Sequence, residues 1–116
     1  MRDQRKNVRI QPFVTPCRVV VGSRAIAAYV TDLSEAGARV TCEASPPSTG
    51  TVVVLEIRIG RSVARSHLSG EIAWVKAADG GSSVFGLSFA NLPTDQQQAL
   101  NQLVGDFRRR AAEIAS

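Results

Sequence analysis

The chain has 116 residues, of which 44% are hydrophobic and only 5% aromatic, so its length suits one domain with an aliphatic core. The formal net charge is +4, and +3 of it lies in the first ten residues, where Arg2, Arg5, Lys6 and Arg9 outnumber Asp3. The near-neutral remainder argues against a broad surface for nucleic acid and favours a local anion site.

Several protein classes are disfavoured by what the chain lacks. It has no secretory leader and no apolar run approaching about 18 residues, which predicts a cytoplasmic protein without membrane insertion. Cys17 and Cys42 lie in separate runs without CxxC spacing, so we expect reduced thiols and neither a zinc site nor a disulfide. No nucleophile with a base, paired catalytic carboxylates or metal cluster is evident, so we expect neither an enzyme nor a cofactor.

Six short runs rich in β-branched residues, separated by turn residues, predict an all-β barrel or sandwich. Residues 79–81 (Asp-Gly-Gly) are typical of a hairpin turn. Within several runs apolar and polar residues alternate, which assigns one face to the core. The predicted strands are 16–21, 25–30, 38–42, 51–59, 68–75 and 84–89.

The last segment changes from strand to helix periodicity. Thr94 followed by Gln97 is a capping-box pattern, and Pro93 separates it from the last strand. Apolar residues then recur at helical spacing, which predicts an amphipathic helix over 94–114 covering one opening or face of the barrel. These residues are Leu100, Leu103, Val104, Phe107, Ala111 and Ile114.

The N-terminal tail carries two arginines four residues apart, Arg5 and Arg9. Such a tail alone is usually solvated. A guanidinium can, however, fork onto guanine, stack on a base or clamp a phosphate. In an extended tail the two Cα atoms lie roughly 13 Å apart, which suits a ligand the size of two nucleotides.

A second motif occupies the turn at 32–37. Asp32, Ser34 and Gly37 are ordinary turn residues, and the turn alone indicates only local structure. The carboxylate of Asp32 would also match the Watson–Crick donors of guanine. Ser34 would add a hydroxyl contact, and Gly37 would let the backbone approach the ligand.

The ordered set of motifs resembles the PilZ domain, a bacterial receptor of cyclic di-GMP. Arg5 and Arg9 match its RxxxR tail, and Asp32, Ser34 and Gly37 match its DxSxxG turn. Residues 70–74 (Gly-Glu-Ile-Ala-Trp) and 85–89 (Phe-Gly-Leu-Ser-Phe) look like two later family strands, so the likeness covers nearly the whole chain.

The resemblance implies a six-stranded antiparallel, split-barrel-like β-barrel with a C-terminal α-helix. It divides a single domain, 1–116, into a flexible basic tail (1–12), a barrel (13–91) and the helix (94–114). It also implies that Arg5, Arg9, Asp32, Ser34 and Gly37 bind cyclic di-GMP between the tail and the outer barrel surface, and that an effector protein senses the ordered tail.

Two further positions are second-tier candidates for ligand binding. Gln4 stands where many PilZ members carry another arginine, which is linked with binding of a stacked ligand dimer. A single bound ligand is therefore favoured, although Arg2 nearby leaves the stoichiometry open. Arg39 lies on the polar face of its predicted strand, two residues after Gly37. His67 is expected at the surface or at a strand edge, and Trp74, alternating with Ile72, is expected to pack in the core or at an edge.

Two alternatives remain open. The chain could be a PilZ-fold adaptor that works through protein contacts without the nucleotide, although both intact motifs weigh against this. It could also be a small nucleic-acid-binding barrel, but that class uses aromatic platforms and a broad basic groove, which are not evident here.

Overall fold

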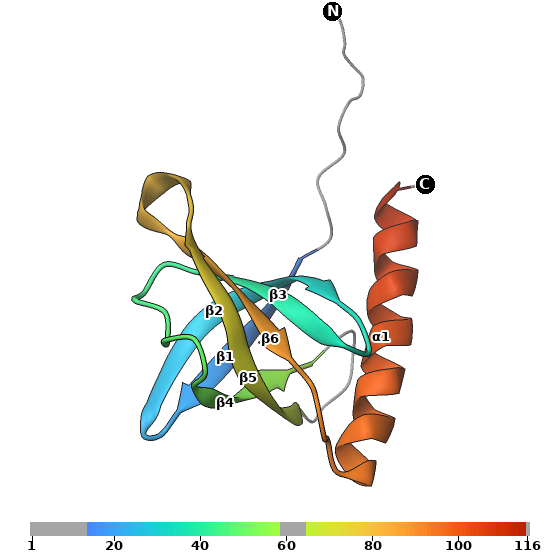
Figure 1. Cartoon of the computed structure of the whole chain (residues 1–116). Helices are drawn as coiled ribbons and strands as arrows, with labels where there is room; N and C mark the ends of the chain where they lie inside the picture. The colour runs from blue at the N-terminus through green and yellow to red at the C-terminus, as the bar shows by residue number, and fades with distance from the viewer. Residues whose placement is uncertain (1–13, 59–64, 116) are drawn as a thin grey trace, which may run out of the picture.

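The computed structural model describes residues 14–58 and 65–115; residues 1–13, 59–64 and 116 are not described. It contains six antiparallel strands and one C-terminal helix, as predicted (Figure 1). The elements are β1 (Thr15–Val21), β2 (Arg24–Leu33), β3 (Gly37–Cys42), β4 (Val52–Ile57), β5 (Ser66–Ala77), β6 (Ser83–Ser88) and α1 (Thr94–Ala115).

The strands close into a barrel in the order β1-β2-β3-β6-β5-β4. Closure comes from β1, which pairs with β2 along one side and with β4 along the other. Every strand therefore has two neighbours, although parts of some strands pair on one side only, such as Val52 and Val53 of β4, which pair with β5. In this ring β3 and β4 lie on opposite sides, so the barrel has two outer faces that point in different directions.

Alternation along the strands places the predicted apolar face inside. The largest fully buried side chains include Phe85, Leu55 and Ile72. Leu100, Leu103, Val104 and Phe107 of α1 join the same core, whereas Ala111 is half-buried and Ile114 is exposed. The helix thus covers the barrel with its first four turns and then extends past it (Figure 1).

The start of the helix differs in detail from the capping-box expectation. The amide of Gln97 donates to the carbonyl oxygen of Pro93 at 2.9 Å. Among the described residues, the Thr94 hydroxyl makes no hydrogen bond to that amide. The boundary was therefore predictable, but the backbone of Pro93 supplies the acceptor that we expected from a side chain.

Two β-bulges change which residues face outward. On β2 the pairing with β3 shifts between Val30 and Asp32, and on β5 the pairing with β6 shifts between Ile72 and Trp74. A bulge adds one residue to one strand and so reverses the inside–outside alternation beyond it. Plain alternation from Val30 and Ile72 would place Asp32 and Trp74 inside the barrel, and the bulges place both outside.

The two cysteines are free and buried. Both pair in register with Ala28 of the strand between them, so their Cα atoms are two strand spacings apart, roughly 10 Å, too far for a disulfide. Burial, followed by the influence of Cys42, raises the pKa of Cys17 to about 12. Burial also raises the pKa of Cys42. Both are core thiols in the protonated form at neutral pH.

Candidate functional site

The candidate site is a row of residues that crosses four strands on the outer barrel surface. Asp32 of β2 pairs with Arg39 of β3, Arg39 pairs with Gly86 of β6, and Gly86 pairs with Trp74 of β5. Asp32, Arg39 and Trp74 are all exposed. We call this row the Asp32 row. It places an acceptor and a guanidinium on adjacent strands, and the Trp74 indole lies over Gly86, on the strand next to Arg39.

Trp74 owes its place in this row to the bulge on β5. The sequence predicted that Trp74 would lie on the same face of the strand as Ile72 and pack in the core or at an edge. The placement on the face of Ile72 was wrong, because the extra residue of the bulge reverses the alternation. The indole covers Gly86, where an added Cβ would overlap it, and still leaves 39% of Trp74 exposed. One face of the ring is thus supported by the sheet, as in aromatic cover of a strand glycine.

The charged members of the row are not paired with each other. Directly opposed residues on antiparallel strands have Cβ atoms roughly 5 Å apart, close enough for opposite charges to interact. Nevertheless, within the described part of the chain, the Asp32 carboxylate and the Arg39 guanidinium form neither an ion pair nor a side-chain hydrogen bond. Neither charged group is therefore neutralised by its cross-strand neighbour.

Ser34 organises the turn that follows Asp32. Its backbone amide donates to the carbonyl oxygen of Gly37 at 2.8 Å, and its Oγ accepts from the amides of Ala36 and Gly37, each at 3.3 Å. The amide of Phe89 donates to the Ala36 carbonyl at 3.0 Å and ties the turn to the end of β6. The hydroxyl therefore fixes the backbone immediately after Asp32.

Gly37 is needed for close strand packing. It pairs with Ser88 of β6, and a Cβ at this position would overlap the backbone carbonyl oxygen of Leu87. Backbone at that distance cannot be displaced as a flexible side chain can. The structure thus gives the motif glycine a folding role, in addition to the expected approach of a ligand.

The helix is linked to the same turn by an ion pair. Nη2 of Arg108 lies 3.4 Å from Oε1 of Glu35, which occupies a variable position of the DxSxxG motif. Both side chains are largely exposed. In Figure 1 the helix runs beside the β2–β3 turn. This contact could not be predicted from the sequence, because the partners lie 73 positions apart in the chain.

The predicted tail residues Gln4, Arg5 and Arg9 lie outside the described residues. The first described strand, however, joins the barrel beside the Asp32 row, because Thr15 pairs with Val30, two residues before Asp32. Among the described residues there is no cluster of three metal-ligating side chains. In the same part of the chain, no helix is long and apolar enough to span a membrane.

Comparisons with known proteins agree with this architecture. Three solved structures are similar: the PilZ domain of YcgR from Escherichia coli with c-di-GMP, the inhibitor of motility MotI/DgrA from Bacillus subtilis, and the PilZ domain of CeSA from a cellulose-synthesizing bacterium. Their TM-scores are 0.71, 0.64 and 0.60, at 18%, 18% and 23% sequence identity. At these identities the likeness concerns the fold.

The coverage of these structures differs. The matches span 95%, 95% and 87% of this chain, and 98%, 53% and 99% of the YcgR, MotI/DgrA and CeSA chains. No curated protein sequence matches this one closely enough to report. The model of the PilZ domain family matches residues 3–106, which confirms the resemblance seen in the motifs. The chain therefore belongs to the PilZ domain family.

Proposed function

We propose that this protein is a receptor for cyclic di-GMP that binds the nucleotide between its N-terminal RxxxR tail and the Asp32 row. PilZ domains typically bind this ligand, and the similar YcgR domain was solved with it. The observation that carries the proposal is the Asp32 row itself. The bulge on β2 turns the Asp32 carboxylate outward beside Arg39, and the bulge on β5 lets the Trp74 indole lie over Gly86, on the strand next to Arg39. Neither charged side chain has an ion-pair partner among the described residues.

Each residue of the row suits a different part of the ligand. The Asp32 carboxylate accepts from the N1–H and amino group of a guanine, which are both donors. The guanidinium of Arg39 suits a phosphate oxygen or the O6 and N7 of guanine. The exposed face of Trp74 offers a platform for a base, a role that base–aromatic stacking fills at about 1–3 kcal/mol per base. Ser34 and Gly37 hold the turn that presents Asp32.

The tail can reach this surface. Six residue steps separate Arg9 from Thr15, and an extended chain covers at most about 3.3–3.6 Å per step, or roughly 20 Å. Since Thr15 enters the barrel beside Val30, that reach includes the Asp32 row. In this proposal Arg5 and Arg9 clamp the ligand from the solvent side, and Gln4 contacts its edge.

The energetics require the tail and the row to act together. Ordering five tail residues costs roughly 5–10 kcal/mol at about 1–2 kcal/mol each. Micromolar affinity needs a further net gain of about 8 kcal/mol. One bidentate arginine contact, worth roughly 1–3 kcal/mol, cannot supply both. We therefore propose that the ligand orders the tail against the row and that an effector protein senses the new surface.

Titration calorimetry with cyclic di-GMP, GTP and cyclic di-AMP tests the proposal. We expect heat from the first nucleotide only, with a stoichiometry of one ligand per chain because Gln4 replaces an arginine. Trp74 is the single tryptophan of the chain, so its fluorescence reports directly on stacking. We expect cyclic di-GMP to change this emission and to leave it unchanged in Asp32→Ala.

Three results would contradict the receptor. Equal heats from all three nucleotides would indicate a generic anion site. No heat from any of them would indicate a PilZ-fold adaptor that does not bind nucleotide. Tighter binding of a single-stranded oligonucleotide than of cyclic di-GMP would indicate a nucleic-acid-binding barrel.

A further inference from the structure

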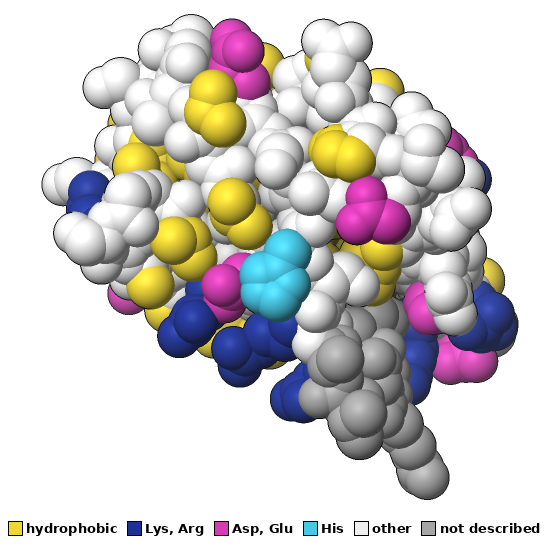
Figure 2. Space-filling view, turned by 90° about the horizontal axis from the view of Figure 1, so that it is seen from below, with side chains coloured by type: hydrophobic (Ala, Val, Ile, Leu, Met, Phe, Trp, Pro, Cys, Tyr) yellow, Lys and Arg dark blue, Asp and Glu magenta, His cyan; other side chains and the backbone are white. Residues whose placement is uncertain are grey.

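A second surface lies on the opposite side of the barrel, on the outer face of β1, β4 and the first half of β5. In register across these strands are Arg18, Glu56 and His67, and further along β4 are Val54 and then Val52, which pairs with Glu71. We call this surface the Glu56 face. Figure 2 shows hydrophobic side chains gathered beside the single histidine, with Lys and Arg side chains along the edge below it.

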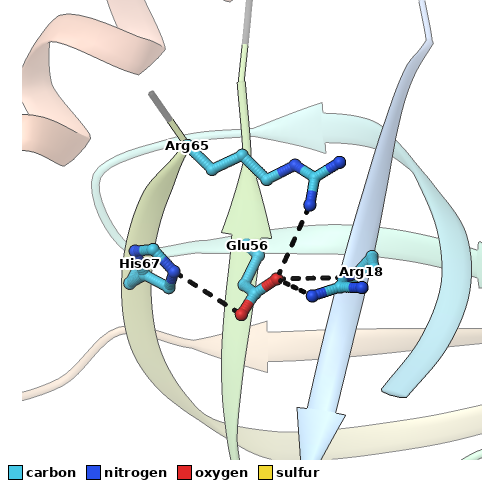
Figure 3. Close-up of polar contacts among 4 residues, drawn as sticks. All are labelled: Arg18, Glu56, Arg65 and His67. Atoms are coloured by element: carbon cyan, nitrogen blue, oxygen red, sulfur yellow. Dashed lines mark hydrogen bonds and ion pairs between the residues drawn. The ribbon is translucent and has the colours of Figure 1, made fainter. Parts of the chain in front are cut away.

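Three basic side chains converge on one carboxylate on this face (Figure 3). Nε and Nη2 of Arg18 donate to Oε1 of Glu56 at 3.0 and 2.8 Å. Nη1 of Arg65 lies 4.0 Å from the same oxygen, and Nε2 of His67 lies 3.5 Å from Oε2. The hydrogen bond from Arg18, first, and the nearby charges hold the pKa of Glu56 below its usual range.

The carboxylate orients these cations but cannot neutralise them all. Arg18, Arg65 and the adjacent exposed Arg58 stand against one Glu56, which leaves a surplus of two positive charges among these four side chains. The Arg18 and Arg65 side chains keep 49% and 47% of their area exposed, whereas Glu56 keeps 15%. The guanidinium groups are thus held in place while part of each still faces solvent.

Aliphatic surface follows the cations along β4. The side chain of Val54 is half-buried, whereas Val52 is 69% exposed, the most exposed large hydrophobic residue in the described part of the chain. Glu71 is exposed opposite Val52. Over four residues of an extended strand, about 13 Å, the face therefore changes from cationic to aliphatic to anionic.

The barrel also restricts how such a face can be recognised. From Val54 to Ile57, β4 is paired on both sides, so its backbone there is not open to a partner strand. Recognition over Val54–Ile57 must therefore come from side chains. Among the described strands, the first half of β5 pairs with β4 alone, and the amide of Ser69 donates to Oε1 of Gln96 in α1. The two surfaces share β5, but the Glu56 face uses its first half and the Asp32 row uses Trp74 in its second half. Glu56 on β4 and Arg39 on β3 lie three strands apart in the ring, so we expect both surfaces to be occupied at the same time.

We propose that the Glu56 face binds an extended segment of a partner protein that carries a carboxylate, an aliphatic side chain and a cation at alternate positions. The carboxylate lies over Arg18, Arg58 and Arg65, the aliphatic side chain packs on Val54 and Val52, and the cation lies over Glu71. Alternate residues of an extended segment point to one side and repeat about every 6.6 Å, which matches the spacing along β4. This interaction does not depend on nucleotide binding.

The test is an NMR titration of the full chain with a cyclised β-hairpin peptide that displays Glu, Val and Lys at alternate positions of one strand. We expect the amide shifts to map to β1, β4 and the first half of β5, and to persist with cyclic di-GMP present. A second hairpin with Gln in place of Glu is expected to bind at least about tenfold more weakly, since hydrogen bonds between charged groups are lost.

Matched variants separate recognition from structure. Arg58→Gln is expected to weaken the hairpin about tenfold, with little effect on folding because Arg58 pairs with no described residue. Val52→Ser is expected to weaken it severalfold. Arg110→Gln, an exposed arginine of α1, and Ile114→Ser are the controls and should leave binding within twofold.

Other outcomes would overturn the proposal. Equal binding of the Glu and Gln hairpins, shifts that map to β3 and β6, or no shift at millimolar peptide would each exclude this docking mode. Tighter binding of anionic phospholipid vesicles or of an oligonucleotide than of the hairpin would exclude a protein partner as the occupant.

Discussion

The two outer faces of this barrel use the same kinds of side chain in opposite ways. On the Glu56 face, Arg18 and Glu56 are cross-strand neighbours joined by two hydrogen bonds. In the Asp32 row, Asp32 and Arg39 are also cross-strand neighbours, yet no ion pair joins them among the described residues. A cross-strand pair of opposite charges is therefore not by itself evidence of a bond or of a site.

The difference between the two carboxylates shows which of them has acceptor atoms left for a ligand. A carboxylate with internal partners has its acceptors occupied, and it serves mainly to orient the cations around it. An exposed carboxylate without such partners retains all of its acceptors. We accordingly assign the small-molecule site to the Asp32 row and a side-chain docking role to the Glu56 face.

The largest expected effect separates the two carboxylates. Asp32→Ala should weaken cyclic di-GMP binding by at least about 30-fold, because it removes hydrogen bonds to a charged acceptor worth about 2 kcal/mol or more. Glu56→Gln is the control and should bind the nucleotide as the wild type does. Titration calorimetry measures both. Equal affinities of Asp32→Ala and wild type would remove the Asp32 row from the ligand site.

Gly37→Ala tests whether the motif glycine is structural. We expect it to lower the free energy of unfolding by about 1–3 kcal/mol, because the new Cβ overlaps the Leu87 carbonyl. Gly105→Ala in α1 is the control, since a Cβ there meets no atom within 4 Å. It should instead stabilise the protein by about 0.5–1 kcal/mol. Denaturant unfolding of both variants gives the comparison.

The Glu56 network should contribute to stability above acidic pH. The folded-state pKa of Glu56 is lowered, so its stabilising contribution is fully present above the unfolded value of about 4.3 and is lost as the pH falls through the folded value. Glu56→Gln should therefore be less stable than wild type at neutral pH. The difference should shrink below about pH 4, as measured by denaturant unfolding at several pH values. A constant difference would contradict the lowered pKa.

The smallest expected effect concerns the contact between Arg108 and Glu35. A double-mutant cycle with Arg108→Ala and Glu35→Ala should give a coupling energy of about 0.2–1 kcal/mol for unfolding, because both side chains are largely exposed. Repeating the cycle with saturating cyclic di-GMP tests whether ligand binding changes the coupling energy between the helix and the turn. An unchanged coupling would mean that the ion pair is independent of the ligand.

The surroundings of His67 illustrate the limit of sequence reasoning. We expected a surface or edge residue, and the side chain is indeed exposed. Glu56, however, faces it from β4, because strand pairing brings the two together. The partner could not be predicted from spacing along the chain.

Local patterns in the sequence determined much of this protein. Alternation in the strands, the turn at Asp79–Gly81 and the helical spacing in 94–114 each depend on neighbouring residues, and the motifs identified the family. Only the tertiary structure decided which residues share a face. The bulges after Val30 and Ile72 exist in the register between strands, so no single strand reveals that Asp32 and Trp74 point outward together. The overlap of a Cβ at Gly37 with the carbonyl oxygen of Leu87 likewise arises between two strands. The two residues are 50 positions apart in the chain, and only strand pairing brings them into contact.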